Sequence, residues 1–251
     1  MSWTFEDHLS SAANAYRRYR PSYPPALLKF LAENAPNHDI ALDIGAGNGQ
    51  AAAGLAHYFE HVYAIEKSQE QIDQPLPTAG VYFHRAPAED TGVKDSCADL
   101  ITVAQALHWF DRPAFYNEAE RILVPGGLLA VFTYGQPSIH PAIDALLEEY
   151  NEEVIAPYWP EAKHVVDDVY ASLQLPFDEV PTPHFRMRTK WTLDEVLGYL
   201  ETWSASRRYR EAHGTFPTDQ IRERLTAIWG EETRRVVTWP LTVFVRRKPR
   251  K

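Results

Sequence analysis

Three glycines at alternate positions, Gly45, Gly47 and Gly49, directly follow the apolar run 40–44 and precede an alanine-rich segment that suits a helix. This order predicts a buried strand, a tight turn and the start of a helix. Glycine suits the turn because it reaches positive φ and has no Cβ to hold a ligand away from the backbone. Nucleotide-like ligands bind in the crevice after the first strand of an open α/β sheet, so the loop predicts such a site.

Two acidic residues narrow the chemistry of the expected ligand. A dinucleotide-binding loop has glycine at its first, third and sixth positions, but the sixth position counted from Gly45 is Gln50. Asp43 would repel a pyrophosphate and could accept hydrogen bonds from an ammonium group. Glu66 ends the next apolar run, where the ribose-binding acid of a βαβ unit belongs. A ribose joined to a cationic amino acid, without phosphates, describes S-adenosylmethionine better than NAD.

With these residues the sequence resembles the class I S-adenosylmethionine-dependent methyltransferases. Roughly residues 10–135 carry the resemblance, and its further motifs are 88–90, 99–101 and 123–127. The resemblance implies an α/β fold: a Rossmann-like, seven-stranded, mostly parallel sheet with helices on both faces and a small helical cap inserted after the fifth strand. It also implies methyl transfer by in-line displacement in a water-poor pocket, with S-adenosylhomocysteine as product and no metal.

The same resemblance assigns contacts to the cofactor. A Tyr…Arg-Pro-x-Tyr-Pro element before the first strand is similar to a small-molecule subgroup that includes trans-aconitate methyltransferase-like proteins. It implies that Tyr16 and Arg20 approach the methionine carboxylate, which a guanidinium can bind with two hydrogen bonds. Ala88 and Glu89 are implied to lie beside the adenine. The residues expected to contact the cofactor are Tyr16, Arg20, Asp43, Gly45, Gly47, Glu66, Ala88, Glu89 and Gln105.

The end of the fourth predicted strand carries residues that suit the methyl acceptor. Because the carboxyl ends of parallel strands line the binding crevice, we expect Gln105, His108 and Trp109 between cofactor and acceptor. His108 is the candidate catalytic residue, a base for any nucleophile that must lose a proton. A structural histidine and a core tryptophan are equally good interpretations of His108 and Trp109. The residues expected to contact the acceptor are Trp3, Trp109, Tyr134, Trp191, Trp203 and Arg207.

Aromatic content indicates the class of acceptor. The chain has seven tryptophans, and a pocket lined with indoles suits a flat or apolar molecule. We therefore expect methylation of a nitrogen or oxygen atom of an aromatic or heteroaromatic metabolite, as in secondary metabolism. Arg207, Arg208 and Arg210 could instead receive a small organic acid, which the trans-aconitate resemblance would imply. An NAD-dependent oxidoreductase and a non-catalytic cofactor-binding protein are the further alternatives.

Composition limits the partners. The chain has 251 residues, a formal net charge of −9 and one cysteine, Cys97. Nucleic-acid binding usually needs a basic face, so the charge argues against DNA or RNA. One cysteine excludes an internal disulfide and suits a reducing cytoplasm. No stretch reaches the ~20 apolar residues of a membrane span. We expect a cytoplasmic monomer or weak homodimer that binds a small molecule, without nucleic acid, membrane or metal.

The resemblance and the sequence patterns also define the expected organisation. We expect a single methyltransferase domain over residues 1–251, with a lid at 1–25 and helical cap and C-terminal additions at 136–180 and 191–235. Asp111 is expected to cap one helix, and Thr192 with Glu195 to cap another. The expected strands are 40–44, 61–66, 81–85, 100–104, 128–133, 180–190 and 236–245, and the expected helices include 25–35, 50–58, 114–123, 141–155 and 218–229.

Overall fold

The computed structural model describes residue 19 and residues 21–73, 75–76, 78–159, 170 and 173–250. The expected lid residues Trp3, Tyr16 and Arg20 lie outside these residues, so their assigned roles stay predictions.

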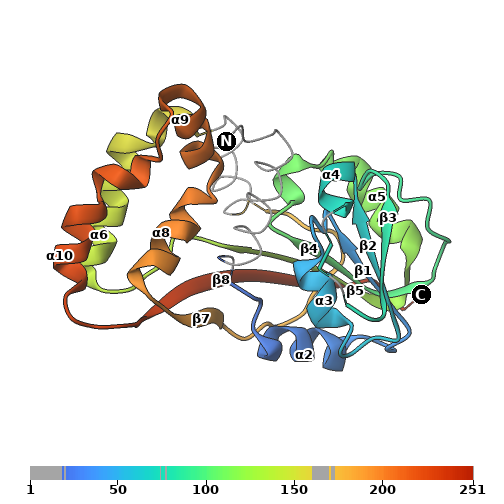
Figure 1. The fold of residues 1–251 in the computed structure, drawn as a ribbon. Helices are drawn as coiled ribbons and strands as arrows, with labels where there is room; N and C mark the ends of the chain where they lie inside the picture. Colours follow the sequence, from blue (N-terminus) through green and yellow to red (C-terminus); the bar gives the residue numbers. More distant parts are fainter. Residues whose placement is uncertain are drawn as a thin grey trace. The chain divides into compact units, whose positions relative to one another are not determined.

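One mixed sheet organises the described chain (Figure 1). Its strand order is β3-β2-β1-β4-β5-β8-β6, and β7 pairs with β8. Strands β1 to β5 run parallel, whereas β8 runs antiparallel to β5 and β6 runs antiparallel to β8. The strands are β1 (Ile40–Ile44), β2 (His61–Glu66), β3 (Val81–Arg85), β4 (Ala98–Ala104), β5 (Leu123–Tyr134), β6 (Asp178–Glu179), β7 (Phe185–Trp191) and β8 (Arg235–Arg247).

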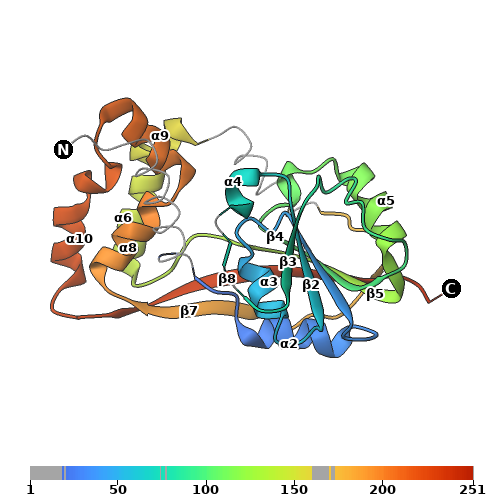
Figure 2. The ribbon, with the colours of Figure 1, turned by 45° about the vertical axis from the view of Figure 1, so that its right-hand side comes forward.

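This topology confirms the predicted α/β fold class, with eight strands rather than seven. The chain order reverses beside β1, which lies between β2 and β4 in the strand order. Figure 2 shows these two neighbours, β2 and β4, from a second side. Ligands of open α/β sheets bind at such a switch point, outside the carboxyl ends of the strands.

The helices are α2 (Pro25–Asn34), α3 (Gln50–Leu55), α4 (Gln69–Ile72), α5 (Arg112–Ile122), α6 (Pro141–Glu149), α8 (Leu193–Glu201), α9 (Ser204–His213) and α10 (Arg222–Trp229), with short turns η1 (Leu107–Trp109), η2 (Tyr150–Val154), η3 (Ala156–Tyr158) and η4 (Pro217–Gln220).

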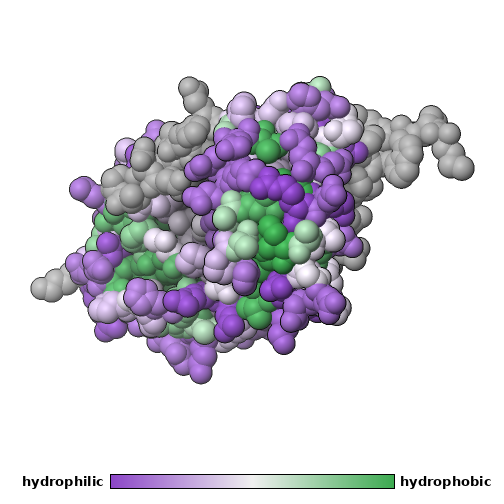
Figure 3. Space-filling view, turned by 90° about the vertical axis from the view of Figure 1, so that its left-hand side faces the viewer, coloured by the Kyte–Doolittle hydropathy of each residue, from purple (hydrophilic) through white to green (hydrophobic). Residues whose placement is uncertain are grey.

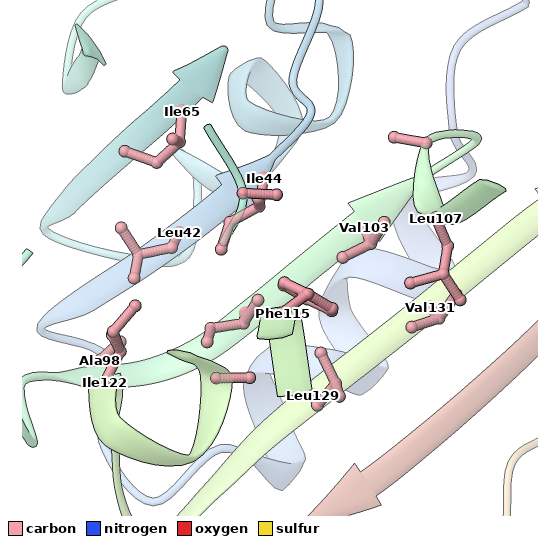
Figure 4. Packing of buried hydrophobic residues seen from close by; sticks show 14 of the residues in the cluster. Leu42, Ile44, Ile65, Ala98, Val103, Leu107, Phe115, Ile122, Leu129 and Val131 are labelled. Carbon is pink, nitrogen blue, oxygen red and sulfur yellow. The ribbon is translucent and has the colours of Figure 1, made fainter. Parts of the chain in front are cut away.

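Alternation along the parallel strands separates two sets of side chains. One set forms the hydrophobic core against α5 and includes Leu42 and Ile44 of β1 (Figure 4). Successive side chains of a strand point to opposite faces. Asp43 stands between Leu42 and Ile44 in the sequence, so its side chain points to the opposite face of the sheet and contacts α3. Burial on both faces explains why β1, β4 and β5 are rich in apolar residues.

The described chain divides into two compact units, and the division falls within β7 and β8. The first, here called the helical unit, contains residues 136–159 and 188–239; the second, the sheet unit, contains residues 22–135, 173–187 and 240–250 together with Tyr170. The expected cap segments at 136–180 and 191–235 overlap the helical unit in part. The expected role of these segments stays a prediction.

Amphipathic helices build the helical unit. Ile143, Leu146 and Leu147 of α6 are buried. Helix α8 begins with the predicted capping box of Thr192 and Glu195, which is confirmed by hydrogen bonds in both directions. Hydrophilic side chains cover most of the face drawn in Figure 3, with apolar residues gathered in a few patches. Among the described residues, no helix is long and apolar enough to cross a membrane.

Candidate functional site

The glycine loop lies between β1 and α3, and all three of its glycines have positive φ: +71° at Gly45, +57° at Gly47 and +88° at Gly49. A Cβ at Gly45 would lie 2.5 Å from the Ala106 Cβ, and one at Gly49 would lie 2.6 Å from the Phe83 ring. Their neighbours therefore exclude a side chain at these two positions. At Gly47 a Cβ would make an ordinary contact of 3.8 Å with the Gln71 side chain, so the neighbours of this glycine leave room for a side chain.

Asp43 supports the loop from inside the sheet unit. Its side chain is 1 % exposed. One oxygen accepts the Ala52 backbone N–H of α3 at 3.0 Å, and the other accepts the Thr102 hydroxyl of β4 at 2.8 Å. Burial raises the pKa of this carboxyl to about 7, although both hydrogen bonds lower it. These contacts point to an indirect role in holding the loop; direct contact with a ligand ammonium group stays a prediction.

The raised pKa of Asp43 has a consequence for stability. The folded protein binds a proton at Asp43 more tightly than the unfolded chain does. Protonation of this group at low pH therefore raises the free energy of unfolding. That gain is complete below about pH 4 and disappears as the pH rises through about 7, with as much as about 4 kcal/mol at stake. We expect Asp43→Asn to remove this part of the pH dependence in urea unfolding between pH 4.5 and 8. Identical pH profiles for both proteins would contradict it.

Glu66, at the end of β2, closes the loop from the other side. Its Oε2 accepts the Gly47 backbone N–H at 2.9 Å, and its Oε1 accepts the Ser68 N–H at 2.8 Å. Backbone N–H groups of Gly45 and Ala46 donate to the Ile65 carbonyl. A carboxylate oxygen can accept two hydrogen bonds, so each Glu66 oxygen keeps the capacity to accept one more. The half-buried carboxylate is thus oriented and still able to bind hydroxyl groups.

A second turn follows β3 and contains Ala88 and Glu89. Ala88 is buried, and the Glu89 carboxylate accepts the Asp111 backbone N–H at 2.8 Å. Asp111 itself caps α5 through Ala114, as predicted. The turn is therefore tied to the first residues of α5.

A partly buried ion pair between Glu118 and Arg121 of α5 holds Thr91, which follows this turn in the chain. Glu118 of α5 accepts both the N–H and the hydroxyl of Thr91 and pairs with Arg121 at 2.8 Å. These hydrogen bonds keep the pKa of Glu118 below its usual range in spite of its burial, which alone would raise it. Sequence reasoning missed this network, although the helical spacing of Glu118 from Phe115 and Ile122 places it on the apolar face of α5.

Gln105 joins the carboxyl ends of β4 and β5. It adopts a positive φ of +57°, a strained conformation for a residue other than glycine. Its amide donates to the Tyr134 carbonyl at 3.0 Å and accepts the Thr133 hydroxyl at 2.6 Å. Strained residues of this kind concentrate at functional sites, where the surrounding structure holds them in place.

His108 and Trp109 lie together on η1, directly after β4. Their rings are 4.9 Å apart between centroids. Trp109 is 66 % exposed, whereas His108 is half-buried, and burial lowers the pKa of its imidazole. Phe110 beside them packs against the position that a Gly45 Cβ would occupy. The structure therefore brings His108 and Trp109 close to the glycine loop.

The other predicted acceptor residues are distributed differently. Tyr134 ends β5, with its ring 6.4 Å from that of Tyr23. Trp191 and Trp203 are 7 % and 5 % exposed and pack in the helical unit, Trp191 against Trp239 and Trp203 against Tyr199. Arg207 is exposed on α9. Contact of these side chains with an acceptor stays a prediction. Among the described residues, no group of three His, Cys, Asp or Glu side chains could hold a metal ion.

Comparisons with known proteins agree with this architecture. A family model described as a methyltransferase domain matches residues 42–131. A Dictyostelium discoideum protein that carries the name of a methyltransferase is 32% identical over 225 residues, which cover 88% of this chain and 86% of the relative. The chain belongs to the class I S-adenosylmethionine-dependent methyltransferase family, and it is an enzyme of that class.

Two further relatives extend the comparison. A structure described as a type II methyltransferase from Anaeromyxobacter dehalogenans is similar at 40% identity and a TM-score of 0.85, covering 92% of this chain and 99% of that one. An uncharacterised methyltransferase of Mycobacterium tuberculosis is 36% identical over 124 residues, covering 48% of this chain and 49% of the relative. Neither description specifies a methyl acceptor.

Proposed function

We propose that this methyltransferase acts on a small molecule, at a nitrogen or oxygen atom of an aromatic or heteroaromatic metabolite. The observation that carries the proposal is Trp109, a 66 % exposed indole beside a half-buried histidine at the carboxyl end of β4. An exposed indole offers a flat apolar face and one N–H donor, which suits stacking on a planar ligand. Exposed apolar surface next to a ligand site commonly marks the contact with that ligand.

The residues of the glycine loop fit the cofactor. Each Glu66 oxygen can accept one more hydrogen bond, as a ribose with two hydroxyl groups requires. The room left at Gly47 admits close approach to the backbone. We assign the ribose to Glu66, the adenine to Ala88 and Glu89, and support of the loop to Asp43. Further contacts are proposed for Gly45, Gly47, Gln105, Tyr16 and Arg20, the last two at the methionine carboxylate.

The protein's part in the reaction is positioning. S-adenosylmethionine, when bound, supplies an electrophilic methyl group on a sulfonium. The chain orients the acceptor beside it and excludes water, and such positioning can contribute up to roughly 7–11 kcal/mol to the barrier reduction. Trp109 would hold the plane of the acceptor, and His108 would contact the polar atom next to the nucleophile. We propose that the enzyme works in the cytoplasm, as a monomer or weak homodimer, without nucleic acid or metal.

The proposal is tested with methyl-labelled S-adenosylmethionine and a fractionated metabolite pool. We expect label in a planar nitrogen or oxygen acceptor, and stabilisation of the protein by S-adenosylhomocysteine but not by NAD in thermal melts. Label in a small organic acid would favour the alternative of carboxyl methylation, with Arg207 as a candidate contact. Label only in protein or RNA would overturn the small-molecule proposal.

His108→Ala tests the role of the histidine. We expect kcat to fall by a factor of about 100, because removal of one positioned hydrogen-bonding group from a reacting site typically costs about 10²–10³-fold in kcat. The affinity for S-adenosylhomocysteine should stay within about threefold, since no cofactor contact is assigned to this side chain. Steady-state kinetics and calorimetry measure the two quantities. Unchanged kcat across the pH range would show that His108 is structural.

A further inference from the structure

Two buried side-chain polar atoms lack a hydrogen-bond partner in the described part of the chain, and they belong to neighbouring rings. They are the Nδ1 atom of His108 and the hydroxyl of Tyr170. The two rings lie 6.4 Å apart between centroids at an interplanar angle of 65°. Tyr170 is 6 % exposed and packs in the core cluster that also contains Leu107. Buried polar groups are nearly always paired, so two unpaired atoms on adjacent rings point to each other as partners.

Counting donors and acceptors decides the direction of the bond. Burial raises the pKa of the Tyr170 phenol to about 12, although the Leu107 backbone lowers it. Tyr170 therefore keeps its proton at neutral pH. The buried O–H of Tyr170 has no acceptor in the structure, and a neutral imidazole nitrogen without hydrogen can accept it.

His108 can be that acceptor because it is neutral at pH 7. Burial lowers the pKa of the imidazole, and no charged group contributes to this shift. The titratable groups that flank η1 in the chain and in the site are Asp111, Arg112 and Glu89, and Glu89 is engaged with the backbone of Asp111. Both atoms are unpartnered in the structure, so a bond between them requires a rotation of one side chain about its χ angles.

We infer that the Tyr170 hydroxyl donates to Nδ1 of His108 and so holds the histidine in the tautomer that carries its proton on Nε2. Tyr170 is then a positioning residue, and His108 presents a hydrogen-bond donor to the acceptor rather than a base. What this tautomer means for the methyl acceptor rests on the proposed function. The tautomer narrows the acceptor to molecules with a lone pair beside the nucleophile, such as a ring carbonyl, a carboxylate or an ionised phenol, that need not give a proton to His108.

The tautomer is tested without substrate, by long-range ¹H–¹⁵N correlation spectra of the histidine rings in the uniformly labelled protein at pH 7.5. His108→Gln identifies the His108 signals among the ten histidines. We expect the shifts of a ring with hydrogen on Nε2 only. In Tyr170→Phe, which keeps the ring and removes the hydroxyl, we expect a mixture of tautomers and a His108 pKa higher by about half to one pH unit. Hydrogen on Nδ1 in the unmodified protein, or unchanged spectra in Tyr170→Phe, overturns the inference.

A kinetic comparison tests the donor role once an acceptor is known. A glutamine amide can donate from nearly the position of Nε2 but cannot act as a base at neutral pH. We expect His108→Gln to keep kcat within about tenfold of the unmodified enzyme, with His108→Ala about 100-fold slower. Equal loss in both variants overturns the donor role. The spectra need no turnover, so a failure of the proposed function is distinguishable from a failure of the tautomer assignment.

Discussion

Asp43→Ala is expected to weaken S-adenosylhomocysteine binding by about 100-fold or more, to below detection in calorimetry. The substitution leaves the Ala52 N–H of α3 without its buried acceptor, whereas the Thr102 hydroxyl of β4 keeps the Leu42 carbonyl at 3.4 Å. An unpaired buried N–H costs about 1–3 kcal/mol in the ordered loop, and each 1.4 kcal/mol that the ligand must supply to order the loop is tenfold in affinity. Because the glycine loop connects β1 to α3, loss of this anchor frees the loop that we assign to the cofactor.

Asp43→Asn is the matched control. The asparagine oxygen can accept from Ala52, and its amide can donate to Thr102, whose hydroxyl lies 3.4 Å from the Leu42 carbonyl as an alternative acceptor. We expect this variant to keep the affinity within about tenfold. If Asp43→Asn binds as weakly as Asp43→Ala, the negative charge itself is required, and Asp43 acts on the ligand directly. Circular dichroism confirms that each variant is folded before calorimetry.

Gly45→Ala is expected to destabilise the protein by about 2–5 kcal/mol. The added Cβ would lie 2.5 Å from the Ala106 Cβ and 3.0 Å from the Phe110 ring, at a backbone φ of +71°. The left-handed conformation costs alanine about 1–2 kcal/mol, and overpacking typically adds 1–3 kcal/mol. For a protein of this size the melting temperature should fall by roughly 5–15 °C. Thermal melts without ligand measure the effect.

Gly47→Ala separates the packing role of the loop from its binding role. Its Cβ would contact the Gln71 side chain at an ordinary 3.8 Å, so only the positive φ opposes the substitution, at about 1 kcal/mol after the gain from a less flexible unfolded chain. We expect a small change in melting temperature but at least tenfold weaker S-adenosylhomocysteine binding, because the methyl group would enter the space that we assign to the cofactor. A melting temperature as low as that of Gly45→Ala would contradict this separation.

Local sequence pattern predicted the central sheet accurately. The expected strands at 40–44, 61–66 and 81–85 coincide with β1, β2 and β3. A continuous apolar run identifies β1, because both of its faces are buried, whereas no residue of β3 is buried and alternation predicts that strand. The boundary of β5 was less accurate: the expected strand at 128–133 begins five residues after the first residue of β5, which spans Leu123–Tyr134. The expected strand at 180–190 begins later, at Phe185, and the two-residue β6 before it was not predicted.

Side-chain partners were less predictable than strands. The acid before the glycine loop was recognised by its position, but its two hydrogen bonds join residues 9 and 59 positions away in the sequence. Thr102 carries no local signal that separates it from other polar residues, whereas Glu118 shares the apolar face of α5 with Phe115 and Ile122. Trp191 and Trp203 illustrate the opposite case, since their residue type predicts a ligand contact and a core position equally well, and the structure buries both.

The sequence by itself determined the glycine loop, the acid at Glu66 and the order of strands and helices around them. Backbone geometry and apolar periodicity are local properties, and a few residue types satisfy them. Only the tertiary structure decided that Asp43 faces inward to α3, that Gly45 is excluded from bearing a side chain while Gly47 is not, and that His108 lies beside Tyr170. Those facts depend on which distant residues meet when the sheet closes, because burial, unpaired polar atoms and steric exclusion arise only from packing.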